Sequence, residues 1–357
     1  MRSAIPLRPV FVIVLLAGLA AVLWVPRVAG AVNCYEDRGV FVCDARPAPP
    51  RFSEPPYAAD SIYYYRSYAW MEDYAYFYDA PNGKVVEQAS EGILYYTIEE
   101  QTTDADGTTW YRVGENMWAR HGDMNPYLDS RFPGAAGHSG PERPFGWILM
   151  PVRPSVAPDV APVEETPRLE RYTFVEVFDA AEGRAGRVWY DIGKGRWIEQ
   201  RFLALIDPDP RPEGVAPGDF WVEVDLYQQT VAAYENNRLV YATLASTGLP
   251  GFETNEGLFT VYARHEEWDM WGGDVGKDYY YLQDVPHTMF FDDDIALHGA
   301  YSHDNFGEVR SHGCVNMPPR GAEWVYYWSE HAPGDTLWVW VHTSSEQDIL
   351  SQFSGES

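Results

Sequence analysis

The feature that most constrains the fold is the recurrence of short runs of aromatic and β-branched residues between turn residues. Such runs have the length and composition of β-strands. Trp221–Leu226 alternates as a strand with one buried face, and Val231–Tyr234 and Leu239–Tyr241 flank Glu235–Arg238 as in a hairpin. Leu337–Val341 is a further apolar strand. The sequence therefore predicts a mainly β protein.

Two stretches depart from the strand pattern. Pro318-Pro319 opens a segment that continues through Trp328, and Gly334 follows it, which predicts a short helix. Residues 262–291 are aromatic but show no regular period, and they predict a long irregular loop. Long irregular stretches inside compact domains are commonly functional.

The part of the chain before residue 200 contains a repeated pattern of tryptophans. Trp110-Tyr111 is followed by Trp118, and Trp189-Tyr190 is followed by Trp197, so the two tryptophans are eight residues apart in each copy. A hydrophobic residue and a glycine follow the Trp-Tyr pair in both copies. This self-similarity predicts an internal repeat.

We assign one small β-module to residues 61–135 and a second, divergent one to residues 136–207, with Pro144–Val152 supplying a segment of the second. Both resemble bacterial SH3-type modules, small barrels found beside cell-wall enzymes. The resemblance implies that they grip peptidoglycan or position the neighbouring domain. The alternative is that the tryptophans only fill a barrel core.

Residues 1–31 have the pattern of an export signal. Arg2 and Arg8 precede an uncharged apolar run, residues 10–25, and Ala29–Ala31 suits cleavage. The run is long for a signal-peptide core and short for a spanning helix, so cleavage and retention as an N-terminal membrane anchor both stay open. In either case we expect the rest of the chain to be extracytoplasmic, secreted or membrane-anchored, and associated with the cell wall.

Charge and cysteine usage agree with that compartment. The formal net charge of -27 argues against a nucleic-acid partner, because phosphates would be repelled. Residues 32–60 predict a linker, within which Cys34 and Cys43 could close a small disulfide loop. Residues 344–357 predict a tail.

Cys314 is then an unpaired thiol, which in an exported protein indicates reactivity. His312 lies two residues before it, and His298 lies further upstream. A thiol attacks as its thiolate, and an imidazole within hydrogen-bond reach can take the proton. Gly313 fits a tight turn in which backbone N–H groups could face an oxyanion.

These residues also carry a family resemblance. His298-Gly299, followed by Ser311-His312-Gly313-Cys314-Val315-Asn316, resembles the signature of the L,D-transpeptidases, the YkuD-type cell-wall enzymes. Thr254–Phe259 is similar to that family's Thr-Pro-x-Gly-x-Phe turn, and Gly307 stands where a glycine is usual. Two positions depart: Asn255 replaces the usual proline, and Asn316 stands where many members carry arginine.

The resemblance implies a C-terminal L,D-transpeptidase β-sandwich with a short helix at residues 219–343, preceded by the SH3-like modules. It implies that Cys314 attacks a donor stem peptide of peptidoglycan and forms a thioester. His298 matches the general base, with the Gly299 backbone orienting its ring. Backbone N–H groups around His312, Gly313 and Cys314, in the loop that Ser311 begins, would form the oxyanion hole.

Further candidates lie around this motif. His312 is assigned to the catalytic set, with a purely structural role in the loop as the alternative. Candidates for substrate binding are Tyr301, His303, Arg310, Asn316 and Gly299, and for several of these a turn-filling or solvated role is the alternative.

Three other interpretations of the chain compete with this one. His298, His303, His312 and Cys314 could form a zinc set, but their spacing matches no compact ligand motif, so no metal or cofactor is predicted. An L,D-carboxypeptidase would let water resolve the same thioester. A non-catalytic wall-binding protein would leave the whole function to the aromatic repeats. The predicted partners are donor and acceptor stem peptides.

Overall fold

The structure is a computed structural model that describes residues 33–37, 40–44, 52–55, 61, 66–137, 143–208, 211–345, 350 and 353. The chain divides into two units, residues 1–50 and 51–357. The predicted export signal lies outside the described residues. Of the helices in the described part of the chain, none has the length and hydropathy needed to span a membrane.

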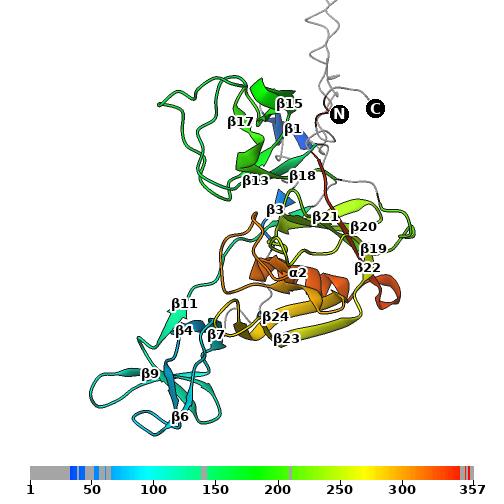
Figure 1. The fold of residues 1–357 in the computed structure, drawn as a ribbon. Helices are drawn as coiled ribbons and strands as arrows, with labels where there is room; N and C mark the ends of the chain where they lie inside the picture. Colours follow the sequence, from blue (N-terminus) through cyan, green and yellow to red (C-terminus); the bar gives the residue numbers. More distant parts are fainter. Residues whose placement is uncertain are drawn as a thin grey trace, which may run out of the picture. The chain divides into compact units, whose positions relative to one another are not determined.

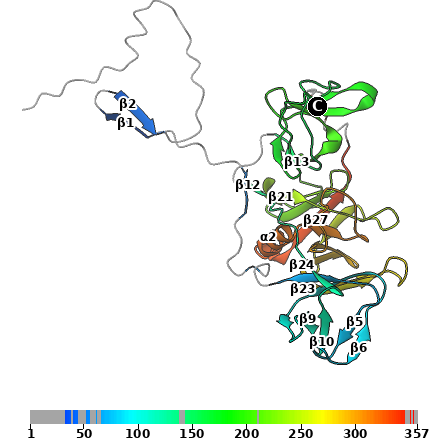
Figure 2. The same cartoon turned by 90° about the vertical axis from the view of Figure 1, so that its left-hand side faces the viewer.

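In the first unit, β1 (Asn33–Asp37) pairs antiparallel with β2 (Val40–Asp44), as Figure 2 shows. The segment expected to be only a linker therefore contains a hairpin. Its register places Cys34 opposite Cys43. A disulfide between them stays a prediction.

The centre of the second unit is built from two sheets, which we call the first and second sheets. Strands of the first sheet follow the order β22 (Gly257–Thr260), β27 (Leu337–His342), β19 (Phe220–Asp225), β20 (Thr230–Glu235), β21 (Arg238–Leu244), β12 (Ala135–Gly137) and β3 (Phe52–Ser53). Strands of the second follow the order β11 (Met124–Tyr127), β4 (Tyr68–Met71), β7 (Ile93–Thr97), β24 (Tyr280–Asp292), β25 (Ile295–Gly299) and β26 (Val315–Met317), with β23 (Ala263–Gly272) also paired to β24. The protein is mainly β, as predicted.

Helix α2 (Pro319–Ser329) packs on both sheets, against β21, β24 and β25 (Figure 1). A proline at the first helical position costs no hydrogen bond, because that N–H has no partner within the helix. Ala322, Val325 and Tyr326 lie on one face of the helix and join the core between the sheets. The predicted helix is confirmed; Gly334 lies beyond its end, in the 3₁₀ turn η4 (Pro333–Asp335).

Strand β19 is buried on both faces, although its alternating sequence predicted one. Val222 and Val224 point into the core shared with α2. Trp221 points the other way, into a second core that also contains Phe145 and Ile206 from another part of the chain. The prediction failed because a β-module covers the face that was expected to meet water.

The hairpin β23–β24 stands where an irregular loop was predicted for residues 262–291. The two strands pair antiparallel from Ala263 opposite Phe290 to Gly272 opposite Tyr280. A register shift interrupts the pairing between Trp268 and Met270, and Asp284 and His287 have positive φ. Such irregularities break the period of two that identifies a strand in a sequence.

Residues 66–127 form the first β-module. It has its own sheet in the order β6 (Val85–Gln88), β5 (Tyr76–Tyr78), β10 (Met117–Arg120), β9 (Thr109–Gly114) and β8 (Glu100–Thr103). Its remaining strands, β4, β7 and β11, belong to the second sheet, where β7 pairs in parallel with β24 (Figure 1). The module is therefore continuous with the hairpin β23–β24 through main-chain hydrogen bonds.

Residues 143–206 form the second β-module. It contains one sheet of β14 (Phe174–Glu176), β13 (Phe145–Ile148) and β18 (Leu203–Ile206), and another of β15 (Asp179–Glu182), β16 (Val188–Asp191) and β17 (Trp197–Glu199), with the 3₁₀ turns η2 (Arg184–Gly186) and η3 (Gln200–Phe202). The predicted segment Pro144–Val152 supplies the central strand β13. Strand β12, which spans the predicted boundary between the two modules, belongs to the first sheet. In the predicted tail, Leu350 and Phe353 pack against the core of the second β-module.

The tryptophan repeat corresponds to the same hairpin register in both modules. In the first module Trp118 lies opposite Arg112, which is two residues after Trp110. In the second module Trp197 lies opposite Asp191, which is two residues after Trp189. The neighbouring strands differ, because β5 pairs with the second strand of one hairpin while β15 pairs with the first strand of the other. The likeness is therefore limited to the hairpin.

Candidate active site

Cys314 lies in a tight loop directly before β26. Ser311 Oγ accepts the N–H of Gly313 (3.1 Å) and donates to the carbonyl of Cys314 (2.5 Å), so one hydroxyl closes the loop. Gly313 has φ +118°, in the region that favours glycine, as the predicted turn requires. Because the Gly313 N–H is used inside the loop, His312 and Cys314 keep the remaining candidate N–H groups for an oxyanion.

A buried threonine fixes this loop through two hydrogen bonds. Thr254 Oγ1 accepts the N–H of Gly248 (3.0 Å) and donates to the Gly313 carbonyl (2.7 Å). The main chain adds a hydrogen bond from Leu249 N–H to the Ser311 carbonyl (2.9 Å). Thr254 entered the sequence comparison only as part of a resemblance, and its contacts give the physical reason for a threonine there.

The Cys314 thiol is half-buried and donates to the Asp294 carbonyl over 3.7 Å. Burial raises its pKa to about 11, and the negative charge of Asp294 acts in the same direction. A backbone hydrogen bond from Ala296 opposes them. The resting group is therefore a neutral thiol that must lose its proton in order to react.

A pocket of about 430 Å³ opens beside Cys314, under the hairpin β23–β24. Its walls include aromatic side chains and three carboxylates, and no lysine or arginine is among the described residues that line it. The residues that bear on the argument are Tyr262, Trp268, Trp271, Tyr280, Asp293 and Asp294. Sequence reasoning did not single out Asp293 and Asp294, because a short acidic turn between two strands carries no signal that it lines a pocket.

His298 lies on β25 in register with Asn316 on β26, and only 3% of it is exposed. Burial lowers its pKa to about 4, against the opposing influence of the Gly299 backbone and the Asn316 side chain. Its Nδ1 has no hydrogen-bond partner among the described residues. Within that same part of the chain no hydrogen bond joins an imidazole to the Cys314 thiol. Catalytic hydrogen bonds are often long before substrate binds, so this geometry leaves His298 a candidate base.

His303 and Asn316 are paired with each other in the interior, although both were predicted to bind substrate. His303 Nδ1 accepts the N–H of Asn305 (3.2 Å), and its Nε2 lies 3.0 Å from the Asn316 amide nitrogen. Burial lowers the pKa of His303 to about 3, with the charge of Arg310 acting in the same direction. With 4% and 9% exposure, these two side chains present almost no surface to a ligand.

Tyr301 is also an interior residue; of the two predicted roles, substrate contact and filling of the turn, its burial favours the second. It is 1% exposed, and its ring stacks on Tyr68 of the first β-module with centroids 3.6 Å apart and planes 4° apart. Gly299 is buried in β25. Arg310 is exposed on the loop before Ser311 and stays a candidate for a substrate carboxylate.

His312 lies half-buried between two aromatic rings. Its ring centroid is 4.5 Å from that of Phe252 and 5.1 Å from that of Tyr280, which lines the pocket. The side chain therefore forms part of the packing between the Cys314 loop and β24. Across the described residues, no group of three or more His, Cys, Asp or Glu is placed to hold a metal ion.

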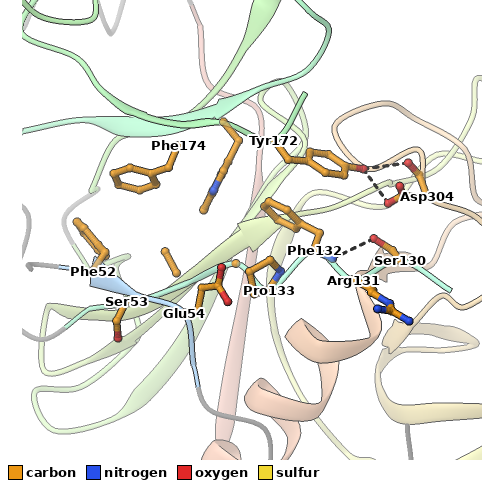
Figure 3. Close-up of a pocket in the computed structure, with 13 residues that line it drawn as sticks. Phe52, Ser53, Glu54, Ser130, Arg131, Phe132, Pro133, Tyr172, Phe174 and Asp304 are labelled. Atoms are coloured by element: carbon orange, nitrogen blue, oxygen red, sulfur yellow. Dashed lines mark hydrogen bonds between the residues drawn. The ribbon is translucent and has the colours of Figure 1, made fainter. Parts of the chain in front are cut away.

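A second cavity, of about 560 Å³, is lined by residues of the second β-module and by Asp304 from the segment between β25 and β26 (Figure 3). Phe52, Phe132 and Phe174 point into it. At its edge the Tyr172 hydroxyl donates to both the carbonyl (2.9 Å) and the carboxylate (3.1 Å) of Asp304. Asp304, the residue after His303, is thus held by hydrogen bonds from the second β-module.

Comparison with known protein families gives a match for one part of the chain. Residues 219–341 match the YkuD family, described as the L,D-transpeptidase catalytic domain. No curated protein matches the chain. The match covers about a third of the chain, so the likeness to an L,D-transpeptidase catalytic domain holds for those residues alone.

Solved structures similar to this chain are also L,D-transpeptidases. L,D-transpeptidase 3 from Mycobacterium tuberculosis is 22% identical over 35% of this chain and 61% of its own, with a TM-score of 0.32. The enzyme from Stackebrandtia nassauensis is 27% identical over 37% and 58%, with a TM-score of 0.28. The catalytic domain of the Enterococcus faecium enzyme is 24% identical over 35% and 98%, with a TM-score of 0.30. The chain thus spans about three-fifths of the length of the first two.

Proposed function

We propose that this chain is an exported L,D-transpeptidase that cross-links stem peptides of peptidoglycan through a thioester on Cys314. The observation that carries the proposal is the position of Cys314. Within the region that matches the catalytic-domain family, its thiol borders a 430 Å³ pocket under the hairpin β23–β24. A pocket with a nucleophile on its wall suits a covalent acyl transfer.

The proposed reaction has two acyl-transfer steps. Cys314 Sγ bonds to a carbonyl carbon of the donor peptide, the C–N bond to the terminal D-amino acid breaks, and the thiol proton leaves on that amine. An acceptor amine then attacks the thioester, the C–S bond breaks, and the proton of the amine returns to sulfur. The atoms balance without any change in oxidation state. The N–H groups of His312 and Cys314 are the proposed oxyanion donors.

His298 is the proposed proton carrier between thiol and leaving group. Since the pKa of Cys314 is about 11, very little of it is thiolate at neutral pH, and the proton must move as the bond to carbon forms. Since the pKa of His298 is about 4, its imidazole is neutral at the same pH and can accept that proton. The exposed Arg310 is proposed to meet a substrate carboxylate.

The test is incubation of the full chain, solubilised in mild detergent, with tetrapeptide-bearing peptidoglycan fragments, followed by mass spectrometry. Cross-linked dimers that have lost the terminal D-amino acid support the proposal. Tripeptide monomers alone would instead identify a carboxypeptidase, and unchanged substrate would contradict both activities.

Variants then test the assignment of residues. Cys314→Ala should abolish the thioester, and His298→Ala should slow its formation by roughly 10²–10⁴-fold, as expected for a lost general base. Replacement of both Cys34 and Cys43 by serine is the matched control, because it removes thiols and leaves Cys314 in place. Turnover by Cys314→Ala would exclude the mechanism.

A further inference from the structure

A buried tyrosine hydroxyl joins the segment between β25 and β26 to the hairpin β23–β24 that borders the pocket. Tyr301 lies between His298 and His303 in sequence, and its hydroxyl donates to the carbonyl of Gln283 on β24 over 2.6 Å. The donor belongs to the segment that carries the candidate base, and the acceptor belongs to the strand that borders the pocket. Since the Tyr301 side chain is only 1% exposed, loss of this bond leaves a buried group without its partner.

The first β-module holds the same two elements from outside the catalytic domain. Tyr68 stacks on Tyr301, and the Tyr95 hydroxyl donates to the Ser302 carbonyl (3.1 Å). Thr97 N–H donates to the side-chain oxygen of Gln283 (3.1 Å). The side-chain nitrogen of Gln283 in turn donates to the Val113 carbonyl (3.2 Å). Gln283 is thus bound on one side by the module and on the other by Tyr301.

The hairpin has two further attachments to the module. Arg66 forms a two-pronged ion pair with Glu267 of β23, with distances of 2.7 and 2.5 Å. Strand β7 pairs in parallel with β24 from Ile93 opposite Tyr280 onward. Tyr280 lines the pocket beside Cys314, so the module's main chain reaches the wall of the pocket itself.

These contacts surround one apolar cluster that reaches the thiol. Tyr68, Tyr301, Met270, Val285 and Ala296 form its buried centre, and Cys314 packs against it. Met270 and Val285 come from the two strands of the hairpin, and Ala296 comes from β25. Movement of the hairpin relative to β25 would therefore change the packing next to the nucleophile.

We propose that Tyr301 is a positioning residue, whose hydroxyl fixes the hairpin β23–β24 over Cys314 with the first β-module as the clamp. This inference rests on the proposed function for its meaning in catalysis. It assigns the first β-module to the active site as a supporting wall. The module's role is then to set the shape of the donor pocket.

Two tyrosines supply a matched pair of variants for the test. Tyr301→Phe removes the hydroxyl that donates to Gln283 and keeps the stacked ring. Tyr68→Phe removes a buried hydroxyl that has no hydrogen-bond partner among the described residues, from the other ring of the same stack. Both substitutions delete one oxygen from one cluster, so a difference between them reports the hydrogen bond.

The first measurement compares two reactions of Cys314 in the full chain. Formation of the thioester with a tetrapeptide donor needs the pocket, whereas alkylation by iodoacetamide needs only the thiol. For Tyr301→Phe we expect thioester formation to slow roughly tenfold, the size of effect of one lost buried hydrogen bond, with unchanged alkylation. Tyr68→Phe should match the wild type in both reactions. Equal slowing by both variants, or normal thioester formation in Tyr301→Phe, would overturn the inference.

The second measurement does not depend on activity. Amide hydrogen exchange of residues 280–292 should become faster in Tyr301→Phe and stay as in the wild type in Tyr68→Phe. Unchanged exchange in Tyr301→Phe would contradict the positioning role even if the enzyme were active. A wild-type chain that forms no thioester would contradict the proposed function instead, so the two failures are distinguishable.

Discussion

Thr254 and Gly313 are joined by a 2.7 Å hydrogen bond from the threonine hydroxyl to the glycine carbonyl. The peptide group that this bond fixes is the one directly before Cys314. Thr254 is 5% exposed and also accepts the N–H of Gly248, so its hydroxyl is fully used in the interior. A single side chain thereby sets the direction of the loop that presents the thiol.

Thr254→Val should destabilise the protein and disturb this loop. Valine keeps the shape but removes the donor to the buried Gly313 carbonyl and the acceptor for the half-buried Gly248 N–H, which leaves both backbone groups without this partner. We expect a loss of roughly 1–3 kcal/mol in the free energy of unfolding, together with slower acylation of Cys314. Denaturant unfolding and acylation kinetics measure the two effects. Thr254→Ser, which keeps the hydroxyl, is the control; equal losses in both variants would count against the hydrogen bonds as the cause.

Asp294→Asn should make Cys314 more reactive at neutral pH. The carboxylate raises the pKa of the thiol, so its removal lowers that pKa and increases the thiolate fraction. We expect the alkylation rate near pH 7 to rise roughly two- to tenfold, with the pH–rate curve shifted to lower pH.

The control for this change is Asp292→Asn, in the same turn. That carboxylate accepts a hydrogen bond from the Asn255 amide (2.8 Å). A shift of the same size in both variants would show that the charge of the turn as a whole, and not Asp294, acts on the thiol.

Three buried histidines should make the fold sensitive to acid. Burial lowers the pKa of His287 and of His298 to about 4, and that of His303 to about 3. As pH falls below the ordinary value of 6.5, the unfolded chain takes up protons at these positions while the folded chain does not. The free energy of unfolding should therefore decrease from pH 6.5 toward pH 4, by up to about 1.4 kcal/mol per pH unit for each histidine.

Denaturant titrations between pH 4 and pH 7 measure this slope. His287→Asn should lower the slope by the contribution of one histidine, because the unfolded chain then takes up about one proton fewer. Asparagine tolerates the positive φ of 55° at that position. His331, exposed at the end of α2, is the control position. An unchanged slope in His287→Asn would mean that other groups cause the acid sensitivity.

Local patterns predicted much of the catalytic domain. The hairpin around Glu235–Arg238, the helix opened by Pro318-Pro319 and the strand Leu337–Val341 are all present, because each depends on turn residues, prolines or a short apolar run. The tight turn at Gly313 was likewise predictable, since a glycine directly before a candidate nucleophile has few structural alternatives.

The environment of the site could not be predicted in the same way. Tyr301 and His303 have the composition of a polar surface loop, yet both are buried by segments distant in sequence. The contact between Tyr68 and Tyr301 and the parallel pairing of β7 with β24 join residues about 190 to 230 positions apart. Nothing in the local sequence encodes such a pairing, so the burial of Tyr301 and His303 could not be predicted from their own segment.

The first sheet joins strands from opposite ends of the chain. β3 (Phe52–Ser53) pairs with β12, β12 pairs with β21, and β27 (Leu337–His342) lies in the same sheet. Strand β19 must therefore wait for its parallel partner β27, which follows it much later in the chain, and loop closure over such a separation is slow. Until β27 is in place, β19 lacks a partner on one edge and β22 has no partner in the sheet, and these edges can pair with other chains. We expect refolding of the whole chain to be slow and to depend on protein concentration, with aggregation competing with closure of this sheet.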